Sequence, residues 1–292
     1  MGKVRITNRT RLAGIFGDPV EQSLSPVMHN AAFEATGIDM VYLPFRVAPG
    51  SLVNAVTAVR GLEMPGVNIT IPHKERVMGL LDEVSDEARA IGAVNTVVND
   101  GGRLRGHNTD GRGWLASLVE ETGFDPRGKT CLVAGAGGSA RAVLHTLLRE
   151  GIGSVTVANR TLERAEALID DLSELFPDAR MTAMVLSKGL LVENAREADL
   201  VVNTTSLGMM GRGAPDLPVE AMRPGAVASD IVYRPLDTDF LKAAARRGLR
   251  VHRGLGMLLY QGALAFELWT GRKAPVETMR AALEGALKEP RK

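Results

Sequence analysis

The segment from Thr130 to Leu148, TCLVAGAGGSARAVLHTLL, constrains the fold of this chain more than any other. An apolar run, Cys131 to Ala134, leads into a glycine-rich turn and then into a helical pattern. A strand, a tight turn and a helix in this order can bind a dinucleotide phosphate, because the unpaired N–H groups of the first helical turn face the anion. The turn residues are Gly135, Ala136, Gly137, Gly138 and Ser139.

Three positions in this segment correspond to the glycines of a dinucleotide-binding fingerprint. Gly135 permits the tight turn, and Gly137 lets the backbone approach the pyrophosphate. Ala140 takes the third position, a variant that the fingerprint allows. The alternative is an ordinary turn between a strand and a helix, because such turns are common.

A second strand-like run, Ser154 to Ala158, ends in Asn159, Arg160 and Thr161, and Arg164 follows. An NAD-binding domain usually carries Asp or Glu about 20 residues past the glycines, where it holds the ribose 2′-OH. A planar, permanently charged guanidinium suits a phosphate instead. The position therefore predicts NADP, and a solvated arginine at a helix start is the alternative.

From about residue 129 onward, short apolar runs alternate with longer helical stretches. This alternation is typical of a doubly wound parallel sheet and predicts an α/β fold. The apolar runs are residues 130–134, 154–158, 199–203 and 226–232.

Composition narrows the class of protein. A length of 292 residues is enough for two domains, and a net charge of +1 gives no support for nucleic acid or an anionic membrane as the main partner. There is no run of about 18 apolar residues that would span a membrane, and the N-terminus lacks the apolar region of a secretory leader. The single Cys131 fits a reducing cytosol, and the five histidines have no metal-ligand spacing. We therefore expect a cytoplasmic protein without a metal site.

Two polar positions in the N-terminal part can be interpreted in more than one way. Ser23 and Ser25 precede a helical stretch over residues 27–35, so Ser25 suits a helix cap, and the two hydroxyls could equally hold a carboxylate. Lys74 lies where a strand-like run over residues 66–71 gives way to an expected helix over residues 75–84. The end of such a strand is where ligands bind in α/β units, although a surface lysine is the alternative.

Polar residues also interrupt apolar stretches further along the chain. Asn95 and Thr96 lie inside an expected strand over residues 93–98, where buried polar groups need partners, and a ligand is one source of them. Asn108 or Thr109 could cap a helix over residues 110–121. Gln261, in an apolar helix over residues 254–269, could be satisfied locally or could reach a substrate hydroxyl.

Nine motifs in order make the chain resemble the shikimate dehydrogenases over nearly its full length. The motifs are SLSPVMHN (23–30), NITIPHK (68–74), GAVNT (92–96), HNTDG (107–111), GAGGSARA (135–142), NRT (159–161), NTTSLGM (203–209), DIVY (230–233) and GLGMLLYQG (254–262).

This resemblance implies the reversible, NADP-dependent reduction of 3-dehydroshikimate to shikimate in aromatic amino-acid biosynthesis. It implies that Lys74 is the catalytic lysine, that Asp110 is its carboxylate partner, and that Ser23 and Ser25 bind the substrate carboxylate. Besides the two serines, the positions that match the substrate pocket are Asn68, Thr70, Lys74, Asn95, Asp110, Tyr233 and Gln261. The positions that match cofactor contacts are Gly135, Ala136, Gly137, Gly138, Ser139, Asn159, Arg160, Thr161, Arg164, Ile231 and Gly254.

The motif order predicts two domains. Residues 1–110 and 250–292 are expected to form a discontinuous substrate-binding and catalytic domain, and residues 111–249 a Rossmann-type NADP-binding domain. The resemblance slightly favours a homodimer over a monomer. The alternatives are a quinate/shikimate dehydrogenase of dual specificity, a methylenetetrahydrofolate dehydrogenase, and a non-catalytic NADP-sensing regulator on the same fold. The SLSP and NTDG motifs argue against the second, and the presence of Lys74 and Asp110 against the third.

Overall fold

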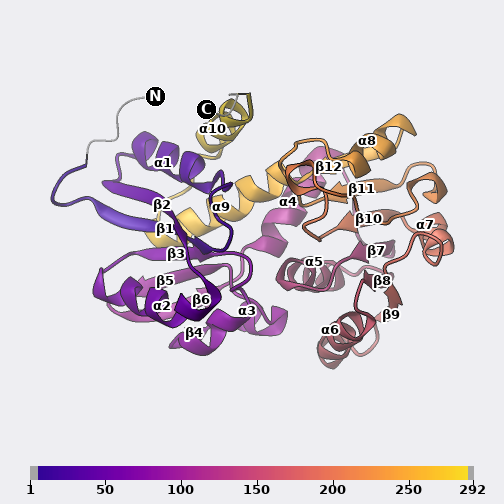
Figure 1. Cartoon of the computed structure of the whole chain (residues 1–292), viewed down its shortest axis with the longest axis horizontal. Helices are drawn as coiled ribbons and strands as arrows, with labels where there is room; N and C mark the ends of the chain where they lie inside the picture. Colours follow the sequence, from indigo (N-terminus) through magenta and orange to yellow (C-terminus); the bar gives the residue numbers. More distant parts are fainter. Residues whose placement is uncertain (1–5, 289–292) are drawn as a thin grey trace. The chain divides into compact units, whose positions relative to one another are not determined.

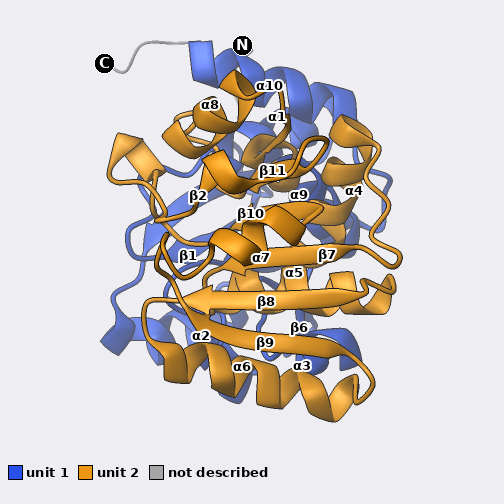
Figure 2. Cartoon of the chain, turned by 90° about the vertical axis from the view of Figure 1, so that its right-hand side faces the viewer, with its two compact units in different colours: residues 1–109, 259–292 blue, residues 110–258 orange. Residues whose placement is uncertain are grey.

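The computed structural model describes residues 6–288 and divides into two compact units (Figure 1). Unit 1 comprises residues 1–109 and 259–292, and unit 2 comprises residues 110–258. Figure 2 shows unit 1 in blue and unit 2 in orange. Each unit is built around its own six-stranded sheet.

The sheet of unit 1 has the strand order β2-β1-β3-β5-β6-β4. The first three strands in this order are parallel, whereas β5 runs antiparallel to both β3 and β6. The strands are β1 (Arg11–Gly17), β2 (Met40–Arg46), β3 (Gly66–Ile69), β4 (Glu83–Val84), β5 (Thr96–Asp100) and β6 (Arg103–His107). The helices are α1 (Ser25–Thr36), α2 (Leu52–Gly61), α3 (Asp86–Ile91), α10 (Val276–Lys288) and most of α9 (Gly254–Thr270), with short 3-10 turns η1 (Pro49–Ser51) and η2 (Arg76–Leu80).

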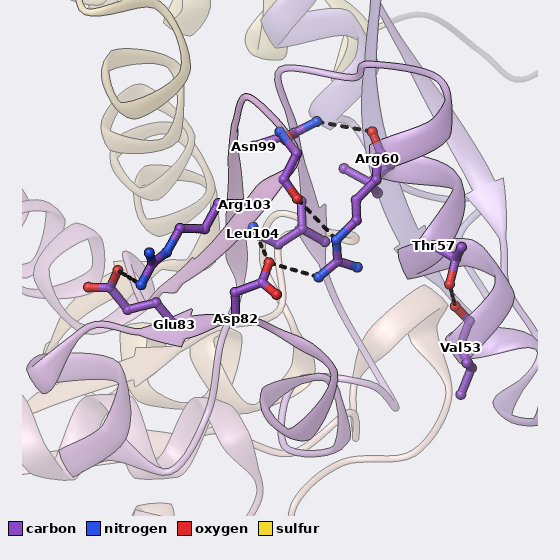
Figure 3. Close-up of polar contacts among 10 residues, drawn as sticks. Val53, Thr57, Arg60, Asp82, Glu83, Asn99, Arg103 and Leu104 are labelled. Atoms are coloured by element: carbon purple, nitrogen blue, oxygen red, sulfur yellow. Dashed lines mark hydrogen bonds and ion pairs between the residues drawn. The ribbon is translucent and has the colours of Figure 1, made fainter.

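An apolar core and a polar cluster hold the sheet of unit 1 in place. Val67 of β3 and Val97 of β5 belong to the same buried cluster as Val56 and Val59 of α2. On the surface, the Asp82 carboxylate accepts hydrogen bonds from the backbone N–H of Leu104 at 2.6 Å and from the Arg60 guanidinium at 2.8 Å (Figure 3). The Leu104 bond, with a second contribution from Arg60, lowers the pKa of Asp82.

Asn99 ties the turn between β5 and β6 to the rest of unit 1. Its amide donates to the carbonyl oxygens of Val59 and Met64, and its oxygen accepts from the N–H of Gly102 at 2.8 Å. Because β5 runs antiparallel to β3, this turn lies near the amino-terminal end of β3. The hydrogen bonds of Asn99 fix the hairpin at that end.

The sheet of unit 2 is wholly parallel, with the strand order β12-β11-β10-β7-β8-β9. Taken in chain order, this is the 3-2-1-4-5-6 arrangement of the doubly wound dinucleotide-binding fold. The strands are β7 (Thr130–Ala134), β8 (Ser154–Asn159), β9 (Arg180–Val185), β10 (Leu200–Asn203), β11 (Val227–Asp230) and β12 (Arg250–Arg253). The helices are α4 (Asp110–Thr122), α5 (Gly138–Arg149), α6 (Leu162–Leu175), α7 (Val192–Glu197) and α8 (Asp239–Arg246), with 3-10 turns η3 (Met209–Gly211) and η4 (Val219–Ala221).

Both faces of this parallel sheet are covered, as the alternation along β7 shows. Cys131 and Val133 belong to the buried cluster formed with α4, α5 and α6, whereas Leu132 and Ala134 belong to the cluster formed with α7 and α8. In Figure 2, β7, β8 and β9 lie side by side with α6 beneath them. The α/β fold class with a Rossmann-type unit is therefore confirmed.

Several expectations from the sequence were wrong in detail. Residues 75–84 do not form one helix: Gly79 is a poor helix former, and the chain extends after η2 so that Glu83 can pair with Arg105. Strands β6 and β9 were missed. Residues 250–258, expected with the first domain, lie in unit 2 because β12 pairs with β11, and Asp110 also falls in unit 2.

Candidate functional site

The predicted substrate residues of unit 1 come together at one edge of its sheet. β1 and β3 are parallel, so their carboxyl ends lie at the same edge, and there Ser23 follows β1 while Thr70 and Lys74 follow β3. The antiparallel β5 begins at this edge, directly after Asn95, and β6 ends there at His107. Chain segments that are far apart in sequence thus deliver their polar residues to the same edge.

A buried network of amides and hydroxyls occupies this edge. The Asn95 amide donates to the Thr109 hydroxyl at 2.9 Å and to the Gln261 side-chain oxygen at 3.3 Å. The Asn95 oxygen accepts from the Thr109 backbone N–H at 2.8 Å and from the Thr96 hydroxyl at 3.0 Å. Asn68 donates to Thr96 at 3.1 Å. All five side chains are less than a tenth exposed.

These contacts revise the interpretation of two residues. The sequence placed Asn95 and Thr96 inside a strand and left a ligand as one source of partners. In the structure Asn95 precedes β5, Thr96 opens it, and other residues of unit 1 supply their hydrogen bonds. Thr109, considered only as a helix cap, joins Asn95 to the backbone oxygen of Gln261. The only sequence signal for this bridging role of Thr109 is a hydroxyl near a polar residue at the start of a strand, and that signal is weak.

Two aromatic side chains support Asn68 from the core, and sequence reasoning missed both. The Tyr42 hydroxyl donates to the Asn68 side-chain oxygen at 2.7 Å. The His29 ring stacks on the Tyr42 ring with 4.5 Å between centroids, and Trp269 also lies against it. His29 is fully buried, both of its ring nitrogens lack a hydrogen-bond partner among the described residues, and burial lowers its pKa to about 3.

The two serines lie at the start of α1, in a different arrangement from the expected one. Ser25 is the first residue of the helix and is buried, and it provides no side-chain cap. Instead, the hydroxyl of Ser23 accepts a hydrogen bond from the Ser25 backbone N–H at 3.2 Å. Both hydroxyls therefore lie at a helix N-terminus, where an anion is favoured.

The backbone around Lys74 is fixed on both sides. The backbone carbonyl oxygen of Thr70 accepts a hydrogen bond from the N–H of His73. The backbone carbonyl oxygen of Lys74 accepts one from the N–H of Val94 at 2.8 Å. His73 is buried, and its ring nitrogen lies 2.6 Å from the Val47 carbonyl oxygen. The half-buried Lys74 side chain thus extends from an anchored loop, in place of the expected helix start.

In unit 2, the glycine turn after β7 has the conformation that the sequence predicted. Gly135 has φ = +115°, which side-chain-bearing residues rarely adopt. Gly137 is the N-cap residue of α5, and nothing lies within 4 Å of where its Cβ would be. The backbone N–H groups of Gly138 and Ser139 open α5, so this turn fits a dinucleotide phosphate.

Two exposed arginines follow β8, where an NAD-binding domain would carry an acidic residue. Among the residues that the structure describes, the side chains of Arg160 and Arg164 make no hydrogen bond or ion pair. Asn159 fixes the turn by donating to the Thr161 carbonyl oxygen at 2.8 Å. Two unpaired guanidinium groups beside a dinucleotide-type turn fit the 2′-phosphate of NADP.

The remaining predicted cofactor positions lie at the carboxyl edge of β11 and β12. Ile231 directly follows β11, and its N–H donates to the Asn203 carbonyl oxygen at 3.1 Å. Gly254 opens α9, and a side chain there would overlap the backbone of Ile231 and Val232. Tyr233 is half-buried in the same loop.

Within residues 6–288, no group of three or more His, Cys, Asp or Glu side chains could hold a metal ion. A search of the same residues finds no helix with the length and apolar character needed to cross a membrane.

Fold and site together define an α/β protein with a Rossmann-type dinucleotide-binding unit and a second unit whose sheet edge carries hydroxyl, amide and ammonium groups. Family models match most of the chain. The shikimate dehydrogenase substrate binding domain matches residues 15–97, the shikimate/quinate 5-dehydrogenase model residues 117–209, and the shikimate 5′-dehydrogenase C-terminal domain residues 254–284.

Relatives of known name resemble the chain over nearly its whole length. The shikimate dehydrogenase (NADP+) of Moorella thermoacetica is 50% identical over 97% of this chain and 96% of its own. A crystal structure of a shikimate dehydrogenase in complex with NADP+ is 37% identical, with a TM-score of 0.90 over 98% of both chains. The Thermus thermophilus enzyme in complex with NADP(H) and shikimate is 42% identical, with a TM-score of 0.84 over 95% of this chain and 100% of its own. The chain belongs to the shikimate dehydrogenase family.

Proposed function

We propose that this protein is an NADP-dependent oxidoreductase that catalyses the reversible reduction of 3-dehydroshikimate to shikimate in aromatic amino-acid biosynthesis. The observation that carries the proposal is the gathering of Ser23, Thr70, Lys74 and Asn95 at one sheet edge of unit 1. These are the polar groups that a hydroxylated ring with a carboxylate requires. The family relationship and the NADP-type turn of unit 2 support the same reaction.

We assign the substrate contacts by chemistry. Ser23 and Ser25 bind the substrate carboxylate at the N-terminus of α1, where hydroxyls and the helix dipole both favour an anion. The ring hydroxyls contact the side chains at the sheet edge, whose amide orientations are fixed by the buried network. Tyr233 is assigned to the substrate on the family resemblance. The residues that serve the hydroxyls are Asn68, Thr70, Asn95 and Gln261.

Lys74 supplies the proton of the reaction. Reduction of the carbonyl consumes one hydride and one proton, and a lysine ammonium carries a proton at neutral pH. Lys74 stabilises the negative charge that develops on the carbonyl oxygen, donates its proton there, and accepts one in the reverse direction. Asp110 is 4% exposed at the start of α4. As the family resemblance implies, we assign it the binding of a substrate hydroxyl and the role of carboxylate partner to Lys74.

The cofactor residues follow from the glycine turn and the arginines of unit 2. When bound, NADPH supplies the hydride. Residues 135–139 hold the pyrophosphate, and Asn159, Arg160, Thr161 and Arg164 hold the 2′-phosphate end. Ile231 and Gly254 contact the rest of the cofactor from the carboxyl edge of β11 and β12.

A quinate/shikimate dehydrogenase of dual specificity is the second candidate, because one matching family model includes quinate enzymes.

We also propose that the protein is a cytoplasmic homodimer rather than a monomer. The one thiol, Cys131, is buried, and its burial raises its pKa. The dimer is therefore expected to form without a disulfide bond between the two chains. Analytical ultracentrifugation tests the dimer.

Absorbance at 340 nm tests the function, with shikimate or quinate and with NADP or NAD in each combination. Fast reduction of the cofactor with shikimate and NADP alone is the expected result. Turnover of quinate would establish the dual-specificity enzyme. A folded protein that binds NADP and turns over neither substrate would overturn the proposal in favour of an NADP-sensing regulator.

A further inference from the structure

A buried carboxylate in unit 2 has no place in the reaction described above. Asp230, the last residue of β11, is 0% exposed and forms no ion pair among the described residues. Its oxygens accept hydrogen bonds from three donors: the Val232 N–H at 2.9 Å, the Thr238 hydroxyl at 2.7 Å and the Asn203 amide at 3.0 Å. A carboxylate buried without a cation is costly, so its retention calls for a functional reason.

The three donors belong to two loops at the carboxyl edge of the sheet. Asn203 ends β10, and its side chain also holds the following turn by accepting from Thr205 and donating to the Leu207 carbonyl oxygen at 3.1 Å. Val232 and Thr238 lie in the loop after β11, and Thr238 caps α8 by accepting from Leu241. Asp230 therefore joins loop 203–208 to loop 231–238, and the second loop carries Ile231 and Tyr233.

We propose that Asp230 is a positioning residue, whose ionised carboxylate holds both loops in the conformation that binds the cofactor. The inference rests on the proposed function. All three neighbours donate hydrogen bonds to the carboxylate. In its protonated form Asp230 would instead present an O–H group to these donors, and one hydrogen bond would be lost. Protonation therefore loosens the loops and weakens NADP binding.

The ionisable groups around Asp230 do not offer another explanation for a pH dependence of the two loops. Burial raises the pKa of Asp230 to about 6, and the three hydrogen bonds oppose the rise. His252, on the neighbouring strand β12, is kept neutral because burial lowers its pKa to about 3. Arg253 pairs with Asp237 at 2.7 Å, and Lys242 pairs with Asp239 at 3.3 Å. The other ionisable side chains of the two loops are Tyr233 and Arg234, and Arg212 directly follows η3.

The test is NADPH affinity, measured by cofactor fluorescence between pH 5 and pH 8 for the wild type and for Asp230→Asn. Losing one buried acceptor is expected to weaken binding about tenfold at pH 8. The ratio of the two dissociation constants should approach one at pH 5, where the wild type is itself protonated. Using the ratio removes the titration of the cofactor's own 2′-phosphate, which has a second pKa of about 6.

Asp199→Asn is the matched control. Asp199 directly precedes the first residue of β10, at the opposite end of this strand from Asn203. There its carboxylate accepts a hydrogen bond from the Thr130 N–H at 3.0 Å and pairs with Arg223 at 3.1 Å. Its loss should leave NADPH affinity within twofold of the wild type at every pH. A ratio for Asp230→Asn that stays near one, or that is the same at all pH values, would overturn the inference. Absence of NADPH binding by the wild type at pH 8 would instead contradict the proposed function.

A second pair of variants covers the case in which Asp230→Asn does not fold. Thr238→Val removes one donor to the carboxylate, so the midpoint of the pH dependence should move to higher pH, and affinity at pH 7 should fall several-fold. Thr238→Ser keeps the hydroxyl and should restore the wild-type midpoint. An unchanged midpoint in Thr238→Val would overturn the inference.

Discussion

Thr204, just past the end of β10, lies directly against Gly135 of the glycine turn, so that a Cβ at Gly135 would overlap the Thr204 hydroxyl. The same hydroxyl donates to the Ala134 carbonyl oxygen at 2.7 Å, which holds the two strand ends together. Gly135 is therefore required twice, for its positive φ and for the space beside Thr204.

Gly135→Ala and Gly137→Ala should separate folding from cofactor binding. Gly135→Ala is expected to destabilise the protein by about 1–3 kcal/mol, because the new side chain is both strained and crowded. Gly137→Ala meets no atom within 4 Å and should leave the unfolding free energy nearly unchanged, while NADP binding weakens because the backbone can no longer approach the pyrophosphate. Thermal unfolding and NADPH titration of both variants measure the two effects.

The opposite pattern, a stable Gly135→Ala or a Gly137→Ala with wild-type affinity, would contradict the role assigned to that glycine.

Arg160→Asp should change the preference for the cofactor. Replacing this guanidinium by a carboxylate removes a charge-assisted contact to the 2′-phosphate, which corresponds to a loss of about 10–100-fold in NADP affinity. NAD lacks this phosphate, so its affinity should change little. Arg180→Asp, at the start of β9 and thus at the other edge of the sheet, is the control and should affect neither. Equal losses for NADP and NAD would show that Arg160 does not recognise the phosphate.

Lys74→Met should reduce kcat by about 10²–10⁴-fold while the KM for shikimate changes much less, because proton transfer is needed only in the transition state. Lys242→Met, on the surface of α8, controls for the loss of a positive charge. Steady-state kinetics in the oxidative direction measure both parameters. A Lys74→Met variant with near-normal kcat would reduce Lys74 to a binding residue.

The sequence predicted the parallel sheet of unit 2 well because its strands are short, continuous apolar runs, and the 130–134 run matches β7 residue for residue. It predicted unit 1 less well. β4 has only two residues, and in β6, RLRGH, Leu104 is the one apolar side chain, so neither gives a clear apolar signal. β9, RMTAMV, was missed although it contains apolar residues; it lies at the sheet edge, and none of its residues is fully buried.

The candidate site shows the same limit. Single residues such as Lys74 and Asp110 could be singled out because they stand in motifs. The contacts of Thr109 with Asn95 and of Tyr42 with Asn68 join residues 14 and 26 positions apart, and they depend on strand pairing that one sequence does not reveal. Asp230 stands in the DIVY motif, yet nothing in this motif indicates a carboxylate buried without a cation.

The stability of unit 1 should fall in acid because of His29. Its pKa is lowered from 6.5 to about 3 by burial, so between these values the unfolded chain binds a proton that the folded chain does not. Stability is therefore retained above pH 6.5 and is lost as the pH falls, by up to about 1.4 kcal/mol per pH unit. His29→Phe keeps an aromatic ring against Tyr42 and removes two ring nitrogens that have no partner among the described residues.

In chemical denaturation between pH 4 and pH 7, His29→Phe should therefore lose less stability on acidification than the wild type, whatever the cost of fitting the larger ring at pH 7. Phe33→Leu is the control, because Phe33 also lies against His29 and carries no titratable group. That variant should lose about the same free energy at every pH, because it removes only packing. If His29→Phe and the wild type lose stability in parallel as the pH falls, burial does not lower the pKa of His29 in the folded protein, and the acid sensitivity arises elsewhere.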